Sequence, residues 1–219
     1  FQILNALIAA GADTETIDNN GWTAIFLACQ HGHVEILNTL ISVGASVRVR
    51  GKDGESPLTI AIAYSKGASK NSVFTKDDGV NDLRSKSFDD SSHIEVVKIL
   101  ISEGIDINKF DINGRTSLCC ACEIGITSII KQLIDAGAAI DLHGKASKPP
   151  LYTAIKFKRI DAVEALIDAG ADVNIVKKGG PNYLKNAIKN DQSEIISLLV
   201  GAGADLDWVQ NEDRDSTLL

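Results

Sequence analysis

A short glycine-containing motif returns along this chain at a fixed interval. The motif reads Gly-Ala followed by Asp, Ala or Ser, with one Gly-Ile-Asp variant. Its glycines are Gly11, Gly44, Gly104, Gly137, Gly170 and Gly203. The interval is constant except between Gly44 and Gly104, where it is nearly doubled, which indicates an insertion in one unit. A period in this range predicts a stack of similar units, because one such unit is too small to bury its own core.

A second motif keeps the same register and marks the start of a helix in each unit. It is a turn with glycine followed by Thr or Ser, at residues 20–23, 53–56 and 113–116. Thr23, Ser56 and Thr116 are predicted helix N-caps, since a hydroxyl oxygen can accept a hydrogen bond from an otherwise unpaired backbone N–H. Apolar residues then recur at helical spacing through two successive helices. The glycine after the second helix suits the left-handed conformation that ends a helix.

In these motifs the chain resembles the ankyrin-repeat family. Residues 18–26 (Asp-Asn-Asn-Gly-Trp-Thr-Ala-Ile-Phe), 56–59 (Ser-Pro-Leu-Thr) and 116–119 (Thr-Ser-Leu-Cys) follow the family pattern Asp-x-x-Gly-x-Thr-Pro-Leu-His. Residues 170–174 (Gly-Ala-Asp-Val-Asn) match the pattern after the second helix. The chain departs from the pattern at 149–150 (Pro-Pro) and 182–183 (Asn-Tyr), where Thr-Pro is usual. The resemblance covers nearly the whole chain and implies an all-α ankyrin-type solenoid of turn-helix-helix repeats, each of about 33 residues, with short hairpin fingers.

The resemblance also implies a division of the chain into repeats within a single ankyrin repeat domain, 1–219. Its parts are a half repeat at 1–17, repeats at 18–50, 51–110, 111–143, 144–176 and 177–209, and the start of a further repeat at 210–219. The insertion is placed at 66–92, as a loop within the second full repeat. Because residues 1–8 align with a second helix and the chain contains no Met, we expect it to be a fragment of a longer array.

The composition excludes several classes of protein. The uncharged apolar runs reach about ten residues, against roughly 20 for a membrane-spanning helix, so no membrane insertion is expected. Phe1 starts inside an amphipathic run with no basic n-region and no cleavage site, so no signal peptide is expected. Four Cys, three of them within 119–122, do not form a disulfide framework. These features predict an intracellular protein, cytoplasmic or nuclear and not secreted.

The insertion at 66–92 is rich in Ser, Lys and Asp, with balanced charge. Its first interpretation is a solvated loop, because lengthening a surface loop costs little free energy. A contact to a partner through Phe74 and Phe88 is a second interpretation. Phosphorylation within Arg84-Ser85-Lys86-Ser87 is a third.

No pattern in the chain predicts catalysis, a metal site or a cofactor. Cys119, Cys120 and Cys122 do not have the paired spacing of a zinc site, and Cys29 shares the unit position of Cys122. We therefore expect these thiols to fill the core as small apolar side chains. His33 and His93 also share a position, and packing is expected for both. The chain has neither a nucleophile elbow nor a phosphate-binding loop, so it is predicted not to be an enzyme.

The resemblance implies that partners meet the concave side, which is built from the finger tips and the outward face of each first helix. Transferred position by position, this surface holds eight Lys or Arg and three Asp or Glu, in a chain of net charge -7. The predicted contact residues are Trp22, His31, Arg50, Lys52, Tyr64, Phe110, Arg115, His143, Lys145, Lys148, Lys156, Phe157, Lys178 and Lys189. Aromatic and Arg side chains are frequent hot spots of interfaces, and a basic surface favours an acidic partner.

Other readings of the same surface stay open. A partner could use mainly Trp22, Tyr64 and Phe110, or the surface could have no partner. Nucleic acid is not expected, because the chain has an isoelectric point near 5.1 and no helix lined with Arg or Lys. No oligomeric state follows from these patterns.

Together the patterns predict a non-catalytic scaffold that binds a protein partner in the concave groove. The alternative is a regulatory or structural segment packed within a larger enzyme, channel or multi-subunit assembly. The resemblance further implies that the finger residues Asn108 and Asn174 could be hydroxylated, as such residues are in some members of the family.

Overall fold

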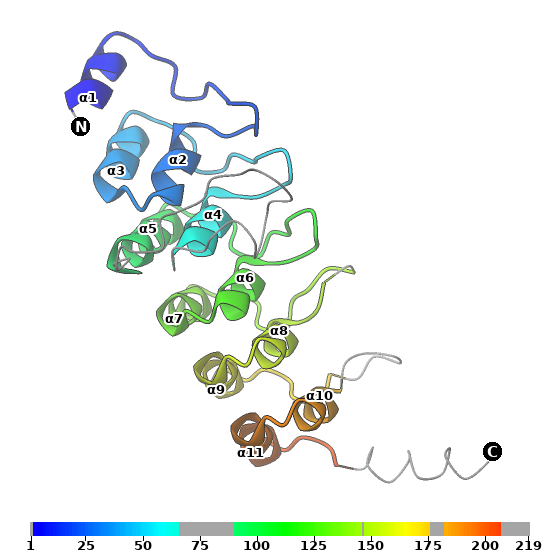
Figure 1. The fold of residues 1–219 in the computed structure, drawn as a ribbon. Coiled ribbons are helices and arrows are strands. Elements are labelled where there is room, and N and C mark those ends of the chain that lie inside the picture. Colours follow the sequence, from blue (N-terminus) through cyan, green and yellow to red (C-terminus); the bar gives the residue numbers. More distant parts are fainter. Residues whose placement is uncertain (1, 66–89, 146, 176–181, 207–219) are drawn as a thin grey trace.

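The fold consists of helices stacked in pairs along one axis (Figure 1). The structure, a computed structural model, describes residues 2–65, 90–145, 147–175 and 182–206. Within these ranges the regular elements are α-helices. They are α1 (Gln2–Ala9), α2 (Ala24–Gln30), α3 (Val34–Ser42), α4 (Pro57–Tyr64), α5 (Asp90–Ser102), α6 (Ser117–Ile124), α7 (Thr127–Asp135), α8 (Pro150–Lys156), α9 (Ile160–Asp168), α10 (Tyr183–Lys189) and α11 (Ser193–Gly201). None of the described helices is long and apolar enough to cross a membrane.

The helices form two columns. The first helices of the units (α2, α4, α6, α8 and α10) make one column, and the second helices (α3, α5, α7, α9 and α11) make the other (Figure 1). Extended hairpins, here called fingers, lead from α1 to α2, from α3 to α4, from α5 to α6 and from α7 to α8, and they project beside the first-helix column. This is the solenoid that the regular repeat period predicts.

Capping side chains explain where most first helices begin. The Ser56 hydroxyl accepts from the Thr59 N–H at 3.2 Å, and the Thr59 hydroxyl oxygen accepts in return from the Ser56 N–H. The Thr116 hydroxyl accepts from the Cys119 N–H at 3.3 Å. At the departure from the family pattern, Asn182 supplies the cap, because its Oδ1 accepts from the Lys185 N–H at 2.8 Å.

The predicted side-chain cap at Thr23 is wrong. The N–H of Phe26, which a cap hydroxyl would satisfy, donates instead to the Thr23 backbone carbonyl at 3.0 Å. The buried Thr23 hydroxyl has no hydrogen-bond partner within the described residues. The first turn of α2 is therefore closed by the backbone alone.

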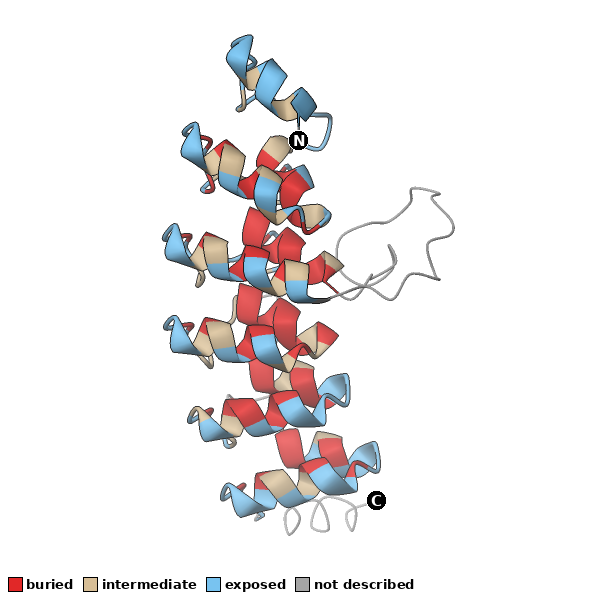
Figure 2. Ribbon diagram, turned by 90° about the vertical axis from the view of Figure 1, so that its left-hand side faces the viewer, coloured by how far each residue is buried: buried red, intermediate tan, exposed pale blue. Residues whose placement is uncertain are grey.

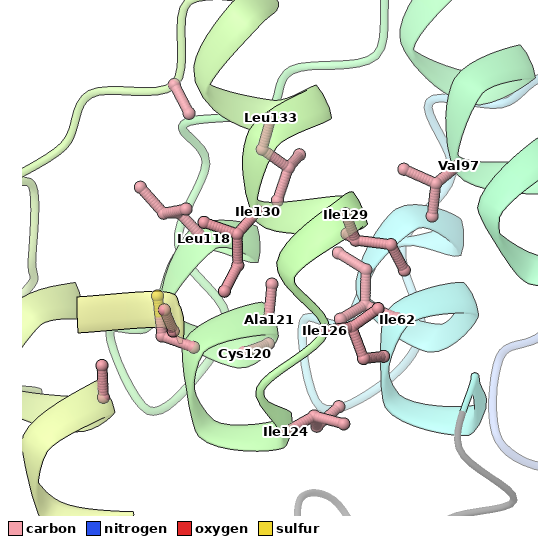
Figure 3. Packing of buried hydrophobic residues seen from close by; sticks show 14 of the residues in the cluster. Ile62, Val97, Leu118, Cys120, Ala121, Ile124, Ile126, Ile129, Ile130 and Leu133 are labelled. Carbon is pink, nitrogen blue, oxygen red and sulfur yellow. The ribbon is translucent and has the colours of Figure 1, made fainter. Parts of the chain in front are cut away.

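The core lies between the two columns and continues from unit to unit (Figure 2). Figure 3 shows one section of it, where Ile62 of α4, Leu118 of α6 and Ile129 of α7 contribute to the same cluster. The four cysteines are free thiols and are buried, as predicted for small apolar side chains of the core. They are Cys29, Cys119, Cys120 and Cys122. Burial raises the pKa of these thiols, so they are poor nucleophiles at neutral pH.

The N-terminal helix differs from the rest of the stack. α1 has no buried residue, and Ile3 and Leu7 on it are exposed. Figure 2 shows this helix almost entirely in the exposed colour. The reason is that α1 is a second helix, and no first helix precedes it within the described residues to cover its apolar side.

The helix after the insertion begins earlier than the predicted end of the insertion at residue 92. α5 starts at Asp90, so residues 90–92 are helical although they were assigned to the insertion. The rest of the insertion, including Phe74, Phe88 and the segment 84–87, lies outside the described residues.

The turn between the two helices of a unit needs a residue with positive φ. Gly32 and Gly125 fill this position with φ of 65° and 80°, whereas the fourth and fifth full repeats use Lys158 and Asp191, at 56° and 54°.

A lysine has a steric cost of about 1–2 kcal/mol in this conformation. We therefore expect Lys158→Gly to raise the free energy of unfolding by about 0.5–1 kcal/mol in urea denaturation, after the larger backbone entropy of glycine is subtracted. Lys158→Ala keeps the Cβ and should change little; an equal gain from both variants would contradict this explanation.

Candidate partner-binding groove

The fingers are joined to one another by backbone hydrogen bonds. An N–H of one finger donates to a carbonyl of the finger before it in the stack. The pairs are Lys52 to Asn20 (3.0 Å), Ile112 to Asp53 (3.3 Å) and Gly144 to Gly114 (2.9 Å). The side of the stack formed by the fingers and the first helices, which we call the groove face, is therefore supported by bonds between units as well as within them.

In the N-terminal part of the groove face, the predicted contact residues already bond within the chain. Trp22 stacks on Phe26 with ring centroids 5.5 Å apart, and its indole N–H donates to Glu55 Oε1 at 2.7 Å. The Arg50 guanidinium donates to the carbonyls of Gly54 and Phe110. These polar groups hold neighbouring fingers together and are less available to a partner.

A hollow of about 390 Å³ opens on the groove face between α6 and α8. Its lining residues are Asn113, Arg115, Glu123, Ser147, Lys148, Tyr152, Thr153, Lys156 and Phe157. Four of the predicted contact residues, namely Arg115, Lys148, Lys156 and Phe157, are thus brought to one place. The volume is in the range of pockets that hold small ligands or single side chains.

A buried ion-pair network holds Arg115 on one side of this hollow. Its guanidinium contacts Asp111 Oδ2 through Nη2 and Nε, both at 2.9 Å, and Glu123 Oε2 through Nη1 at 3.4 Å. The other Asp111 oxygen accepts from the backbone N–H groups of Asn113 and Arg115. The side chains of Arg115, Asp111 and Glu123 are only 17%, 0% and 13% exposed. Arg115 therefore organises the finger and is not a free cation.

The two lysines of the hollow differ from Arg115 in their exposure and in their ion pairing. Lys148 and Lys156 are exposed, and neither forms an ion pair with a carboxylate of the part of the chain described here. The Lys156 ammonium lies 5.2 Å from the centroid of the Phe157 ring. The hollow thus combines two available cations with aromatic surface from Phe157 and Tyr152.

The remaining predicted contact residues are spread along the groove face. His31, Lys52, Phe110, Lys145 and Lys189 are exposed. Tyr64 and His143 are partly buried, and His143 Nδ1 lies 3.0 Å from the Asp141 carbonyl. Lys178 lies outside the described residues. Within the described ranges, no group of His, Cys, Asp and Glu side chains is arranged to hold a metal ion.

Sequence reasoning missed Asp111, Ser147, Tyr152 and Thr153. A signal existed for Asp111, because the finger pattern Asp-x-x-Gly-x-Thr begins at that residue. Asp18 begins the same pattern and likewise accepts from two backbone N–H groups, of Asn20 and Trp22, each at 2.8 Å. For the other three no signal was available, since their contribution depends on how two neighbouring units meet.

Asn108 and Asn174 connect consecutive units. Each Oδ1 accepts at 2.8 Å from a backbone N–H of the next unit, that of Ala139 or Asp205. Each Nδ2 donates to a glycine carbonyl of that unit, at 3.4 Å for Asn108 and 2.9 Å for Asn174. One asparagine therefore satisfies both a donor and an acceptor. Their hydroxylation remains a proposal, independent of this structural role.

Asp141 occupies the equivalent position but can make only half of this connection. Its Oδ2 accepts from the Asp172 N–H at 3.2 Å, while the buried Oδ1 has no partner within the described residues. We expect Asp141→Asn to stabilise the chain by about 1 kcal/mol, because Nδ2 can then donate to the Gly170 carbonyl. The matched change Asn174→Asp should destabilise it by a similar amount, as measured by urea denaturation.

The pH dependence of that effect follows from the environment of Asp141. Burial raises the pKa of its carboxyl group, so the charged form lowers the stability of the folded chain. This cost disappears when the group is protonated at low pH and is fully present above the raised pKa. The gain from Asp141→Asn should therefore be larger at pH 7 than at pH 4. A gain that does not change with pH would contradict the role given to the carboxylate.

A sequence profile for ankyrin repeats, described as three copies, matches residues 1–73, 88–177 and 131–210. The chain belongs to the ankyrin-repeat family. Ankyrin repeats are generally protein–protein interaction modules, and the family is typically not enzymatic.

Individual relatives are similar to about two thirds of the chain. An ankyrin repeat protein of Acanthamoeba polyphaga mimivirus is 29% identical over 62% of this chain and 19% of its own length. An L-asparaginase of Dirofilaria immitis is 29% identical over 63% of this chain and 24% of its own. The B-cell lymphoma 3 protein homolog of Mus musculus is 24% identical over 68% of this chain and 36% of its own. The chain thus matches between about a fifth and a third of the length of these relatives.

Proposed function

We propose that this ankyrin chain binds a partner protein through its groove face and that the bound segment is acidic. The observation that carries the proposal is the state of Lys148 and Lys156. Both line the hollow, both are exposed, and neither is paired with a carboxylate in the described part of the chain. An acidic segment would give these ammonium groups the ion-pair partners that the described part of the chain does not supply.

The wider groove face supports the same polarity. Lys52, Lys145 and Lys189 are exposed there as well, whereas two of its three predicted acids are not free. Glu55 is buried against Trp22, and Glu123 is held by Arg115. The accessible charge is therefore mostly positive, which speeds association with an acidic partner through long-range attraction.

Aromatic surface beside these charges would supply the apolar part of the contact. Phe157 is 37% exposed and lies at the hollow, next to the partly buried Tyr152. Buried aromatic anchors surrounded by polar groups provide much of the binding free energy in typical interfaces. The bound segment should accordingly carry apolar residues as well as acids. An intracellular location, cytoplasmic or nuclear, is part of the proposal, because a reducing compartment suits four unpaired thiols.

A peptide selection tests this function without knowledge of the partner. Random peptides are selected on the native chain and, separately, on the double variant Lys148→Glu, Lys156→Glu. A second double variant, Lys98→Glu with Lys131→Glu on α5 and α7, reverses two exposed lysines of the second-helix column and serves as the control. We expect acidic peptides from the native and control chains and their loss from the groove variant. Peptides without acidic enrichment, or equal recovery from all three chains, would reject the proposal.

A second candidate function is a regulatory or structural segment within a larger protein. It is favoured by the similarity to an L-asparaginase that is much longer than the matched region. In that case the groove face would pack against another part of the parent chain. Its test is binding in trans between this chain and the rest of the parent polypeptide. Loss of that binding in the Lys148→Glu, Lys156→Glu variant would support this candidate, and no binding by the native chain would reject it.

A further inference from the structure

Glu123 occupies a position that repeats along the first helices of the stack. Its counterparts in the other full repeats are uncharged or basic, namely Gln30, Ala63, Lys156 and Lys189. Among the full repeats Glu123 is therefore the acidic residue at this position, and it lines the hollow. Nothing in the capping or core packing of α6 requires a carboxylate at this place, since the helix is capped by Thr116 and buried through its apolar side chains.

The charge of Glu123 is only partly balanced. Its contact with Arg115 is 3.4 Å, whereas Arg115 makes two contacts of 2.9 Å with Asp111. Two acids thus share one guanidinium, and the three side chains together carry a net charge of about -1. Burial raises the pKa of the Glu123 carboxyl group in spite of the opposite effects of Arg115 and Lys156, so this place already disfavours negative charge. Lys148 and Lys156 line the hollow beside this network.

We propose that Glu123 makes the hollow selective for one isolated carboxylate and against a run of acidic residues or a phosphorylated side chain. This inference rests on the proposed function, because it assumes that the lysines of the hollow receive an acidic segment. The two lysines, set against the net charge of about -1 of the Arg115 network, leave the hollow with a net charge of about +1, which one carboxylate balances. A second negative charge would enter a partly desolvated space beside an acid whose own cation is shared, and like charges repel strongly there. A phosphate group, with nearly two charges, meets the same repulsion.

Three defined peptides of equal length test the selectivity. One has a single Glu between Phe and Leu, one has a run of four Glu, and one has phosphoserine in place of the single Glu. Their dissociation constants are measured by fluorescence anisotropy on the native chain, on Glu123→Gln and on the control Glu164→Gln, which changes an exposed acid of α9. Glutamine keeps the shape of the side chain and can still accept a hydrogen bond from Arg115, and equal melting temperatures establish that the variants fold.

The native chain is expected to bind the single-Glu peptide most tightly. Glu123→Gln should improve binding of the four-Glu and phosphoserine peptides by about tenfold and that of the single-Glu peptide by less than about twofold. Glu164→Gln should leave all three unchanged. If the native chain binds the peptides but their ranking is the same in Glu123→Gln, the selectivity role is wrong and the proposed function stands. If the native chain binds none of them, both are wrong. A variant that lost affinity for all three equally would show a structural role for Glu123 and would also reject selectivity.

Discussion

Truncation of Leu118 to alanine should lower the free energy of unfolding by about 3 kcal/mol. Leu118 is fully buried in α6, in the middle of the stack, where it belongs to the cluster shown in Figure 3. The change removes apolar contacts and leaves a cavity that the surrounding helices cannot fill without moving. Urea denaturation followed by circular dichroism measures the loss. Because each unit is stabilised by its neighbours, damage to a central unit should also separate the unfolding of the two halves.

Leu27→Ala is the matched control for that prediction. Leu27 on α2 allows the same leucine-to-alanine substitution, but this residue is 46% exposed. Its truncation should cost less than about 1 kcal/mol, since little apolar surface leaves the core. Similar losses for Leu118→Ala and Leu27→Ala would contradict the description of a core that runs between the two helix columns.

Reversal of both lysines in the hollow should have the largest effect on binding. For an acidic partner or peptide obtained by selection, Lys148→Glu with Lys156→Glu is expected to weaken affinity by about 100-fold, roughly 3 kcal/mol. Each substitution both removes an attraction and adds a repulsion. The remaining affinity should also depend less on salt, because fewer favourable charge pairs are left to screen. Isothermal titration calorimetry at two salt concentrations measures both effects.

The control for this prediction is again the pair on the second-helix column. Lys98 and Lys131 are exposed on α5 and α7, and Lys98 only faces Glu95 across 3.6 Å of well-exposed surface. Their reversal changes the net charge of the chain by the same amount as reversal in the hollow. A loss of affinity of more than about twofold in this control would mean that total charge, and not the hollow, governs binding.

The fold could be predicted from the sequence because most units repeat the same local signals. The regularly spaced glycines mark the ends of second helices, and in the first three full repeats Thr or Ser after the turn marks a first helix. Even the departure at Asn182 follows a local rule, since asparagine is also a good N-cap. Local rules failed at Thr23, where the backbone carbonyl replaced the hydroxyl, and at the start of α5.

The details of the groove face could not be predicted, because they depend on which side chains contact one another, both within a finger and between units. Arg115 was expected to face a partner, but the Asp111 carboxylate at the base of the same finger holds it. Lys148, Lys156 and Phe157 of the fourth full repeat meet Arg115 and Glu123 of the third only through the stacking of these two repeats, which sequence spacing does not describe. The exposed charge of this face therefore differs from the charge counted along the sequence.

His33 and His93 share a position in their units, but their burial also depends on the neighbouring unit. His93 is buried as expected, and its Nε2 lies 3.1 Å from the Gln30 carbonyl at the end of the preceding first helix. Arg159 and Gln192 reach the carbonyls of the corresponding helix ends in the same way, at 3.1 Å each. The prediction for His33 is wrong, because this residue is exposed. Within the described residues the element before α2 is a second helix, so no first-helix end faces His33.

Site-specific photo-crosslinking shows whether a partner protein binds at the hollow. A benzophenone amino acid replaces Phe157 in one chain and Lys131, on α7 of the second-helix column, in another. Both chains are irradiated in lysate of the source cells, and crosslinked peptides are identified by mass spectrometry. We expect a crosslink from position 157 to a segment with an isolated acidic residue beside apolar residues, and none to that segment from position 131. Crosslinks to the same partner segment from position 131 alone would contradict it and place binding on the opposite side of the stack.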